Sequence, residues 1–288
     1  MKGKIKNKKI LISVILVLAV LLSYYLYYQN TALQLGVYKI ESEKLPAAFD
    51  GAKIVQVSDF HNTKSAPLRE SLAAEIKEQA PDIIVITGDI VDSRKTNMEI
   101  SLDFVEEIKD IAPIYYVPGN HESRLEDYRV LANNLQDLGV IVLENRSESF
   151  ELDGESIELV GLIDPMFAHE KTVKNEVISA KMLDEIDFDE ASFSVLLAHR
   201  PELFEVYEKY GFDLMLSGHA HGGQIRLPFF GAFLVPNQGF FPEYAEGRID
   251  GNGTMIISRG IGNSLAPFRI NNRPELIVVE LGSLAENK

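Results

Sequence analysis

Two histidines one residue apart lie between glycines in the stretch SGHAHGGQ, residues 217–224. Imidazole is a common metal ligand, but a glycine-flanked pair could also be an ordinary turn. Asp59 and His61 repeat the spacing of His219 and His221. On an extended chain, residues two apart point to the same side, so each pair could present two ligand atoms to one place.

Each of these pairs follows an apolar run that is rich in β-branched residues. The runs KIVQVSDFH, PDIIVITGDIVD, PIYYVPGNHE, SFSVLLAHRP and FDLMLSGHAH all end in a polar cluster. Near-continuous apolar runs predict strands that are buried on both faces. Helical patterns separate several of them, for example from Pro67 to Ile76 and from Leu131 to Leu138. The order predicts α/β units.

The mixture also contains antiparallel elements. The stretch SFELDGESIELVGL reads as a hairpin that turns at Asp153 and Gly154. Later, GTMIISRG and PELIVVEL are predicted strands without a helix between them. The fold class predicted from these patterns is therefore a mixed α/β fold with some antiparallel pairing.

Polar residues at the predicted strand ends form one set. In open α/β sheets, ligands bind at the carboxyl ends of the strands. Cys is absent, so thiolate ligands and disulfides are excluded, and imidazole, carboxylate and amide groups remain as ligands. The sequence therefore predicts a metal site at the strand ends. Its candidates are five of the six histidines and three oxygen ligands: His61, His121, His199, His219, His221, Asp59, Asp89 and Asn120.

The same residues resemble the motifs of calcineurin-like metallophosphoesterases. Asp59-x-His61, Gly88-Asp89-x-x-Asp92, Gly119-Asn120-His121-Glu122, His199 and Gly218-His219-x-His221 occur in that family's order, over residues 53 to about 280. The C-terminal stretches HGGQIRLP, SRGIGNS and NNRPELIVVEL are similar to the membrane-associated bacterial branch, whose members resemble phosphodiesterases and UDP-diacylglucosamine pyrophosphatases. The resemblance implies a four-layer αββα sandwich, with two mixed sheets packed between helices.

The resemblance also implies two divalent metal ions and assigns their ligands. The first metal would be held by Asp59, His61 and His221, and the second by Asn120, His199 and His219, with Asp89 bridging both. His121 would lie beside the phosphate as a catalytic residue without binding metal. Asp92 and Glu122 match positions outside this ligand set. Nitrogen and oxygen ligands of this kind admit Mn, Fe or Zn.

Two metals at such a site could activate a hydroxide and stabilise the charge on a phosphoryl group. The expected function is hydrolysis of a phosphodiester or pyrophosphate bond, on a phosphoester substrate that could be lipid-linked. Phosphomonoester hydrolysis, on a protein or a small molecule, is the alternative within the enzyme class. A metal-binding domain without catalysis would be expected to lack a ligand, and the motifs here are intact.

The N-terminus differs in kind from the rest of the chain. Five lysines within residues 1–9 precede an uncharged run at residues 10–28, ILISVILVLAVLLSYYLYY. Nineteen residues span roughly 28 Å as a helix, close to the thickness of a bilayer. The sequence predicts a basic cytoplasmic segment (1–9), a transmembrane signal anchor (10–28), a tether with an entry strand (29–52) and a metallophosphoesterase domain (53–282). A cleaved signal peptide and a buried soluble helix are the alternatives.

Charge bears on partners and location. Residues 29–288 carry 23 basic and 43 acidic side chains, a net charge of −20. So acidic a domain is expected to repel nucleic acid and anionic membrane surfaces, so no specific nucleic-acid partner is predicted. The lysines predict a cytoplasmic N-terminus and hence a single-pass protein of the cell membrane, with its catalytic domain outside the cytoplasm. The sequence does not predict the oligomeric state.

One aromatic segment, RLPFFGAFLVPNQGFFPEY at residues 226–244, allows two interpretations. Its phenylalanines could be buried in the core beneath a loop-rich flap. They could instead form an apolar lip that receives a lipid or the bilayer. Where relatives carry a Gly-Leu-Tyr-like sequence, this chain reads EGRID, with Arg248. Arg259, Arg269 and Arg273 could bind phosphate or form ordinary ion pairs, and His169 is expected on the surface.

Overall fold

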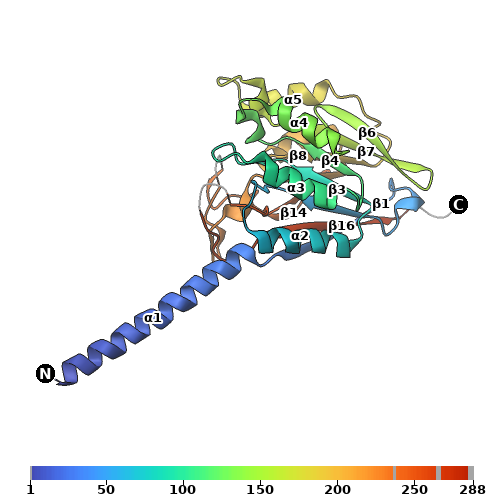
Figure 1. Ribbon diagram of the computed structural model, residues 1–288. Helices are drawn as coiled ribbons and strands as arrows, with labels where there is room; N and C mark the ends of the chain where they lie inside the picture. Colours follow the sequence, from blue (N-terminus) through green and yellow to red (C-terminus); the bar gives the residue numbers. More distant parts are fainter. Residues whose placement is uncertain (1, 236–237, 264–266, 285–288) are drawn as a thin grey trace.

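The computed structural model describes residues 2–235, 238–263 and 267–284, with side chains described from residue 7 onward. A long helix, α1, leads into a domain of two stacked sheets with helices outside them (Figure 1). The helices are α1 (Lys2–Thr31), α2 (Ala66–Gln79), α3 (Met98–Ile108), α4 (Tyr128–Asp137), α5 (Asn175–Asp184) and α6 (Phe204–Tyr207).

The first sheet has six strands, in the order β1-β16-β2-β3-β4-β5. They are β1 (Gln34–Ser42), β16 (Glu275–Ser283), β2 (Lys53–Val57), β3 (Ile83–Thr87), β4 (Ile114–Val117) and β5 (Ile141–Val142). All neighbours are parallel except β16 and β2, so the sheet is mixed. Helices α2 and α3 follow β2 and β3, as parallel crossovers require.

The second sheet also has six strands, in the order β14-β15-β9-β8-β7-β6. They are β14 (Gly247–Asp250), β15 (Thr254–Ile257), β9 (Leu214–Ser217), β8 (Ser194–Ala198), β7 (Glu155–Leu162) and β6 (Arg146–Leu152). The predicted hairpin is β6–β7, with Asp153 and Gly154 in left-handed backbone conformation at its turn. The predicted strands GTMIISRG and PELIVVEL become β15 and β16, which lie in different sheets.

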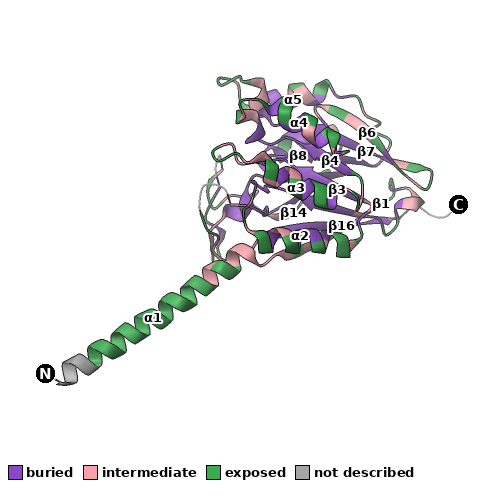
Figure 2. Ribbon diagram, viewed as in Figure 1, coloured by how far each residue is buried: buried purple, intermediate pink, exposed green. Residues whose placement is uncertain are grey.

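Alternation along each strand divides the core into layers. On β3, Ile83 and Val85 pack between the two sheets, whereas Ile84 and Ile86 pack against the helices. On the far side, strand residues such as Val160 pack with Phe204 of α6. Figure 2 shows the central strands buried, including β3, β4 and β8, whereas β6 at the edge of the second sheet is largely exposed or half-buried. The predicted mixed fold with four αββα layers and two mixed sheets is confirmed.

Residues 29–52 are joined to the domain more closely than a tether would be. Helix α1 continues to Thr31, and β1 then pairs with β16 along its whole length, from Gln34 opposite Glu275 to Ser42 opposite Ser283. A short 3₁₀ helix, η1 (Ala47–Phe49), buries Phe49 between the sheets. Because nine consecutive residues pair, Gln34–Ser42 is an edge strand of the first sheet, within the range predicted to hold a tether and an entry strand.

Helix α1 leaves the domain as a single exposed rod (Figure 2). The segment Asn7–Thr31 is long and apolar enough to cross a membrane, and none of its apolar window is buried inside the protein. The alternative of a buried soluble helix is therefore wrong for this structure. Exposed apolar side chains line the helix from Ile10 to Leu22.

Candidate metal centre

The candidate ligands lie where the carboxyl ends of the two sheets meet. Asp59 and His61 follow β2, and Asp89 follows β3, in the first sheet, whereas His199 follows β8, and His219 follows β9, in the second. Hydrogen bonds join the two sheets at this place. The backbone N–H of His219 donates to the carboxylate of Asp59 at 3.0 Å, and Nδ1 of His199 donates to the carbonyl oxygen of Thr87 at 2.8 Å.

The first group consists of Asp59, His61 and His221, whose ligand atoms lie within 4.8 Å of one another. Nε2 of His221 is 3.2 Å from Oδ1 of Asp59 and 3.1 Å from Nε2 of His61. Burial lowers the pKa of His61 to about 3 and the pKa of His221 well below its usual range, so both imidazoles are neutral. Neutral imidazole is the form that binds metal.

The second group consists of Asp89, His199 and His219. Nε2 of His199 is 3.2 Å from Oδ2 of Asp89. Because Nδ1 of His199 donates to the Thr87 carbonyl, its Nε2 is the atom turned toward the site. Burial lowers the pKa of His199, but the carboxylates of Asp89 and Asp59 outweigh that effect and raise it to about 10. A positive charge is therefore favoured where this group lies.

The carboxylate of Asp89 lies between the two groups. Its Oδ2 is 3.7 Å from Nε2 of His61, in the first group, as well as 3.2 Å from Nε2 of His199, in the second. Its Oδ1 accepts a hydrogen bond from the backbone N–H of His121 at 2.7 Å. Burial raises the pKa of Asp89, but His199, His121 and His61 outweigh it and lower that pKa well below the usual range. Asp89 is thus an ionised carboxylate that lies within 4 Å of an imidazole from each group.

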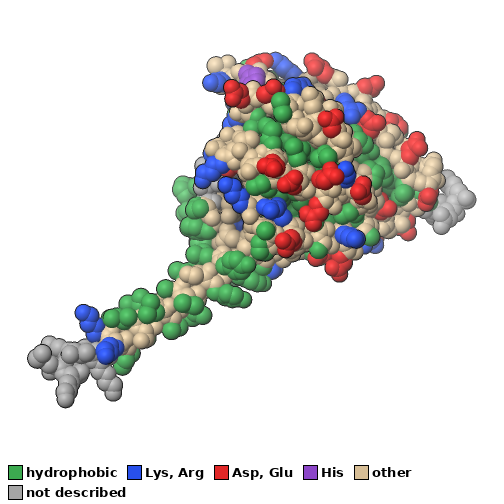
Figure 3. Space-filling model, in the orientation of Figure 1, with side chains coloured by type: hydrophobic (Ala, Val, Ile, Leu, Met, Phe, Trp, Pro, Cys, Tyr) green, Lys and Arg blue, Asp and Glu red, His purple; other side chains and the backbone are tan. Residues whose placement is uncertain are grey.

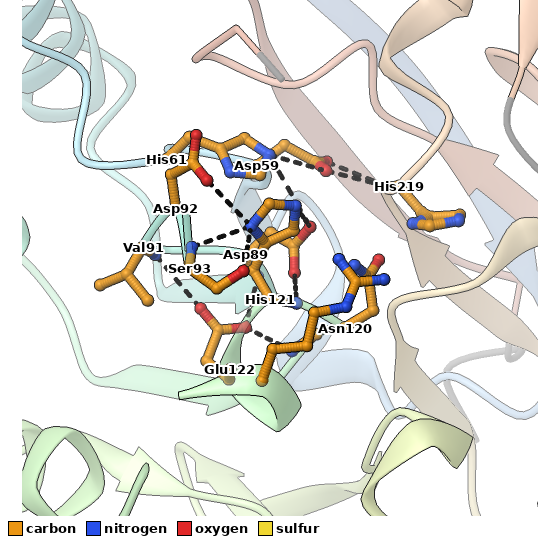
Figure 4. Close-up of polar contacts among 12 residues, drawn as sticks. Asp59, His61, Asp89, Val91, Asp92, Ser93, Asn120, His121, Glu122 and His219 are labelled. Carbon is orange, nitrogen blue, oxygen red and sulfur yellow. Dashed lines mark hydrogen bonds and ion pairs between the residues drawn. The ribbon is translucent and has the colours of Figure 1, made fainter. Parts of the chain in front are cut away.

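The amide of Asn120 lies beside the imidazole of His219 (Figure 4). The side-chain atom nearest to His219 is 2.7 Å from its Nδ1. If that atom is the amide nitrogen, it donates to Nδ1, and the amide oxygen then accepts from Arg124. If it is the oxygen, Asn120 and His219 turn two acceptors toward the same point, an arrangement that a cation stabilises.

His121 is held by the loop that follows β3. The backbone N–H of Ser93 donates to its Nδ1 at 3.0 Å, and Oδ1 of Asp92 lies 3.3 Å from the same atom. Burial lowers the pKa of His121 below its usual range despite Asp89 and Asp92. In the neutral ring Nδ1 accepts, so the proton is on Nε2, which lies 3.9 Å from Oδ2 of Asp89. His121 therefore turns an N–H donor toward the site (Figure 4).

Asp92 and Glu122, which the sequence analysis placed outside the ligand set, both make contacts at the site. Asp92 belongs to a third group of possible ligands, with His61 and His121. Glu122 is fully buried and accepts hydrogen bonds from the backbone N–H groups of Asp89 (2.8 Å), Gly119 (2.7 Å) and Val91 (3.2 Å). It therefore ties the loop after β3 to the loop after β4. The signal in the sequence was their place within the GDIVD and GNHE motifs.

A buried ion pair between Arg200 and Asp164 lies next to the second group of ligands. Arg200 donates to Asp164 at 2.7 and 3.2 Å and to Glu202 at 3.1 Å. Oε1 of Glu202 is 3.8 Å from Nε2 of His219. The sequence gave no sign of this network, because Asp164 is far from the other motifs in the chain and meets Arg200 only through folding.

The glycines of the motifs are required by close contacts. A Cβ at Gly218 would lie 1.8 Å from Oγ of Ser58 and 2.3 Å from Oδ2 of Asp59, and one at Gly119 would lie 2.4 Å from Oδ1 of Asp89. Backbone strain concentrates in the same place. Five candidate ligands have left-handed backbone conformations: Asp59, His61, Asp89, His219 and His221.

The donor set fits metal ions. Among the described residues, Nδ1 of His61 and Nδ1 of His221 are buried and have no hydrogen-bond partner, while their Nε2 atoms face each other. Two acceptors at that distance need a proton or a cation between them. Burial raises the pKa of Asp59 to about 6, as expected for a carboxylate whose charge the protein alone does not balance. All eight residues named from the sequence come together here, and their individual roles remain predictions.

The other residues considered in the sequence lie elsewhere. His169 is exposed, at the end of the 3₁₀ helix η3 (Pro165–Ala168). Arg269 is fully buried and donates to the backbone carbonyl oxygens of Arg259, Gly260 and Gly262, so it holds a loop together. Arg273 contacts Tyr28 of α1.

These observations define a cluster of possible metal ligands, and comparison with known proteins identifies the class of the chain. Residues 52–223 match the model of the calcineurin-like phosphoesterase family, so the chain belongs to that family and is a metallophosphoesterase, a hydrolase of phosphoester bonds. It is 32% identical to YkuE of Bacillus subtilis, an uncharacterized metallophosphoesterase, over 85% of this chain and 84% of YkuE.

Two further proteins are similar. Phosphodiesterase YaeI of Escherichia coli is 30% identical, over 80% of this chain and 82% of YaeI. The crystal structure of TT1561 of Thermus thermophilus shares the fold, with a TM-score of 0.50 at 12% identity, over 73% of this chain and 90% of that chain.

Proposed function

We propose that this protein hydrolyses phosphodiester or pyrophosphate bonds at a centre of two divalent metal ions. The position of Asp89 carries the proposal, because one carboxylate lies within 4 Å of imidazoles from both ligand groups. Asp59, His61 and His221 would hold one ion, Asn120, His199 and His219 the other, and Asp89 both. Similarity to a phosphodiesterase supports the diester class.

Mn, Fe or Zn bound there would supply Lewis acidity and a nucleophile at neutral pH. The residues of the chain contribute the rest. The Nε2–H of His121 is directed into the site, where it can donate to a phosphoryl oxygen or to the leaving oxygen. Ser93 fixes the tautomer of His121, and Glu122 fixes the two loops that carry Asp89 and His121. A preorganised donor of this kind favours the more highly charged transition state.

A direct test uses the full-length chain in detergent, freed of metal and then loaded with Mn²⁺, Fe²⁺ or Zn²⁺. Hydrolysis of bis(p-nitrophenyl) phosphate is compared with that of p-nitrophenyl phosphate, and metal content is measured on the same sample. We expect faster turnover of the diester. Preference for the monoester would instead support the phosphomonoesterase alternative. Absence of turnover of both substrates with two metals bound would contradict an enzymatic role.

We further propose that α1 is an uncleaved, single-pass membrane anchor, with a cytoplasmic N-terminus and the catalytic domain (53–282) outside the cytoplasm. Its length, its exposure and the lysines before it support this topology. A phosphoester substrate exposed at the membrane surface, including a lipid-linked one, would be within reach of such an enzyme.

The natural absence of Cys makes the topology testable. Lys9→Cys and Glu185→Cys place single thiols on either side of the proposed span, and Glu185 is exposed. A membrane-impermeant maleimide added to intact cells should label only the second variant. Labelling of the first would reverse the topology, and a chain shortened by the length of α1 would show that the segment is a cleaved signal.

A further inference from the structure

An exposed aromatic patch lies on two short hairpins directly after the metal centre. The hairpins are β10–β11 (Arg226–Leu227 and Gly231–Ala232) and β12–β13 (Leu234–Val235 and Gly239–Phe240). Phe229 is fully exposed, and Phe230 and Phe240 are 72% and 65% exposed. We define the aromatic patch as Phe229, Phe230, Phe233, Leu234, Phe240 and Phe241.

The two hairpins form one continuous surface. The ring of Phe233 packs against the rings of Phe240 and Phe241 at 5.2 and 6.0 Å, and Phe230 lies 6.4 Å from Phe241. Phenylalanines were expected either in the core or on an apolar lip, and the structure places these on the surface. These rings leave much of their area in water, which is unfavourable without a partner.

The base of the patch is fixed to the core beside the candidate ligands. Ala232 and Val235 are buried, and the close approach of Ala232 to Gly223 joins β11 to the 3₁₀ helix η6 (His221–Gly223). Ile225 also forms an isolated parallel β-bridge with Ile270. The hairpins are therefore attached to η6, the element that carries His221, and their outer residues point away from it.

The end of α1 gives the depth of the patch relative to a bilayer. The hydroxyl of Tyr25 donates to Oδ1 of Asn271 at 2.8 Å and accepts from the backbone N–H of Asn271. Nδ2 of Asn271 donates to the carbonyl oxygen of Arg226, the first residue of β10. Tyrosines at the end of a membrane span lie at the headgroup level. With α1 anchored as proposed, β10 would begin near that level, because Asn271 joins Arg226 to Tyr25.

This junction is not a single contact. Gln29 accepts from the backbone N–H of Asn272 at 3.0 Å, and Nδ2 of Asn272 in turn donates to the carbonyl oxygen of His221 at 2.7 Å. Asn30 accepts from the backbone N–H of Arg269 at 3.1 Å. Figure 1 shows the loops after η6 on the side of the domain where α1 leaves it, and Figure 3 shows hydrophobic side chains gathered there.

Charge indicates what kind of surface would cover the patch. Residues 29–288 carry a net charge of −20, so the domain as a whole is repelled by anionic surfaces. Attraction must then come from apolar contact. Phe229 and Phe241, moreover, have left-handed backbone conformations, which cost free energy for aromatic residues.

From these observations we propose that the aromatic patch inserts into the outer surface of the bilayer in which α1 is anchored. The inference rests on the proposed anchoring of α1, and it adds a second membrane contact beside the metal centre. The helix and the patch together hold one orientation of the domain, with the element that carries His221 next to the lipid headgroups. Phosphoesters presented by membrane amphiphiles are the substrate class that this orientation favours.

The absence of Trp from the chain provides a sharp test, because any Trp introduced is the sole reporter. Phe230→Trp and Phe240→Trp report on the patch. Leu16→Trp reports on the middle of α1, and Val177→Trp, at an exposed position of α5 away from α1, is the matched control. Each full-length variant is reconstituted into phosphatidylcholine vesicles, with and without brominated acyl chains as quenchers.

We expect the emission of F230W and F240W to shift to shorter wavelengths and to be quenched by bromines close to the headgroups. The emission of V177W should be unchanged, and that of L16W should be quenched by bromines deep in the bilayer. If F230W and F240W behave like V177W while L16W is quenched, the patch proposal is overturned and the anchor stands. If L16W is not quenched, the anchor fails. Quenching at the patch alone would then support the second contact, and no quenching at any position would overturn both.

Discussion

The metal centre and the aromatic patch depart in opposite ways from the usual distribution of side chains, in which charged groups are exposed and large apolar groups are buried. At the metal centre, carboxylates and imidazoles are buried, among them Asp59, Asp89 and His199. At the patch, a few residues further along the chain, phenylalanine rings are exposed to water. Buried charges normally need partners, and exposed apolar clusters normally need a covering surface.

Both regions also place non-glycine residues in left-handed backbone conformation, but the surroundings of these residues differ. The strained residues of the metal centre are held by hydrogen bonds, such as the one from the His219 N–H to Asp59. At the patch, Phe229 is fully exposed. In our proposals each region is completed from outside the chain, one by divalent cations and the other by a lipid surface. The following predictions separate the two.

The largest effect is expected from Asp89→Asn. An amide cannot supply the negative charge that both ligand groups share, so we expect kcat/KM to fall by about 10³-fold or more, about 4 kcal/mol of transition-state stabilisation. Metal analysis should show reduced occupancy of both ions. Asp103→Asn, on the exposed face of α3, is the matched control and should leave both quantities unchanged. Loss of only one ion in the Asp89 variant would show that this carboxylate is not shared.

A smaller effect is expected from His121→Ala. Removal of the Nε2–H donor should lower kcat by about 10²-fold, with metal content unchanged, because His121 is predicted to bind substrate rather than metal. The loss should grow with the basicity of the leaving group if His121 donates to the leaving oxygen. A loss independent of the leaving group would assign the donor to a phosphoryl oxygen instead, and unchanged activity would remove His121 from the site.

Glu122→Gln tests whether a residue outside the ligand set shapes the centre. The amide NH₂ would face backbone N–H groups of Asp89, Gly119 or Val91, so at least one donor would lose its acceptor. We expect metal affinity to fall by about 10–100-fold. Activity should recover largely at high metal concentration, as titration would show. Failure of excess metal to restore activity would indicate that Glu122 acts other than by positioning the loops.

The smallest effect should come from the exposed side of the hairpins, and two adjacent residues allow a matched comparison. Val235 is fully buried, whereas Leu234 is 46% exposed. We expect Val235→Ser to lower the free energy of unfolding by about 2 kcal/mol, and Leu234→Ser by less than about 0.5 kcal/mol. Denaturant unfolding of the full-length protein in detergent measures both. Equal losses would mean that the outer face of the hairpin is packed within the protein.

Much of the centre could be predicted from local sequence. The strands β2, β3, β4, β8 and β9 are short apolar runs, and residues directly after parallel strands meet at one edge whatever the rest of the chain does. That is why His61 and Asp89 could be assigned to the edge of one sheet, and His199 and His219 to the edge of the other. The packing of the two sheets then brings both edges to one site. Asp92 and Glu122 were visible in the motifs, but their contacts with His121 and with the loop N–H groups depend on how two loops meet.

The sequence by itself determined the apolar helix α1, the succession of strands along the chain and the polar residues that end them, since these follow from periodicity and residue type. The tertiary structure alone decided three further features. It brought Arg200 to Asp164, it turned the phenylalanines of the hairpins outward, and it joined the end of α1 to the loop behind His221. Each depends on contacts between segments far apart in the chain, which residue type and spacing do not specify.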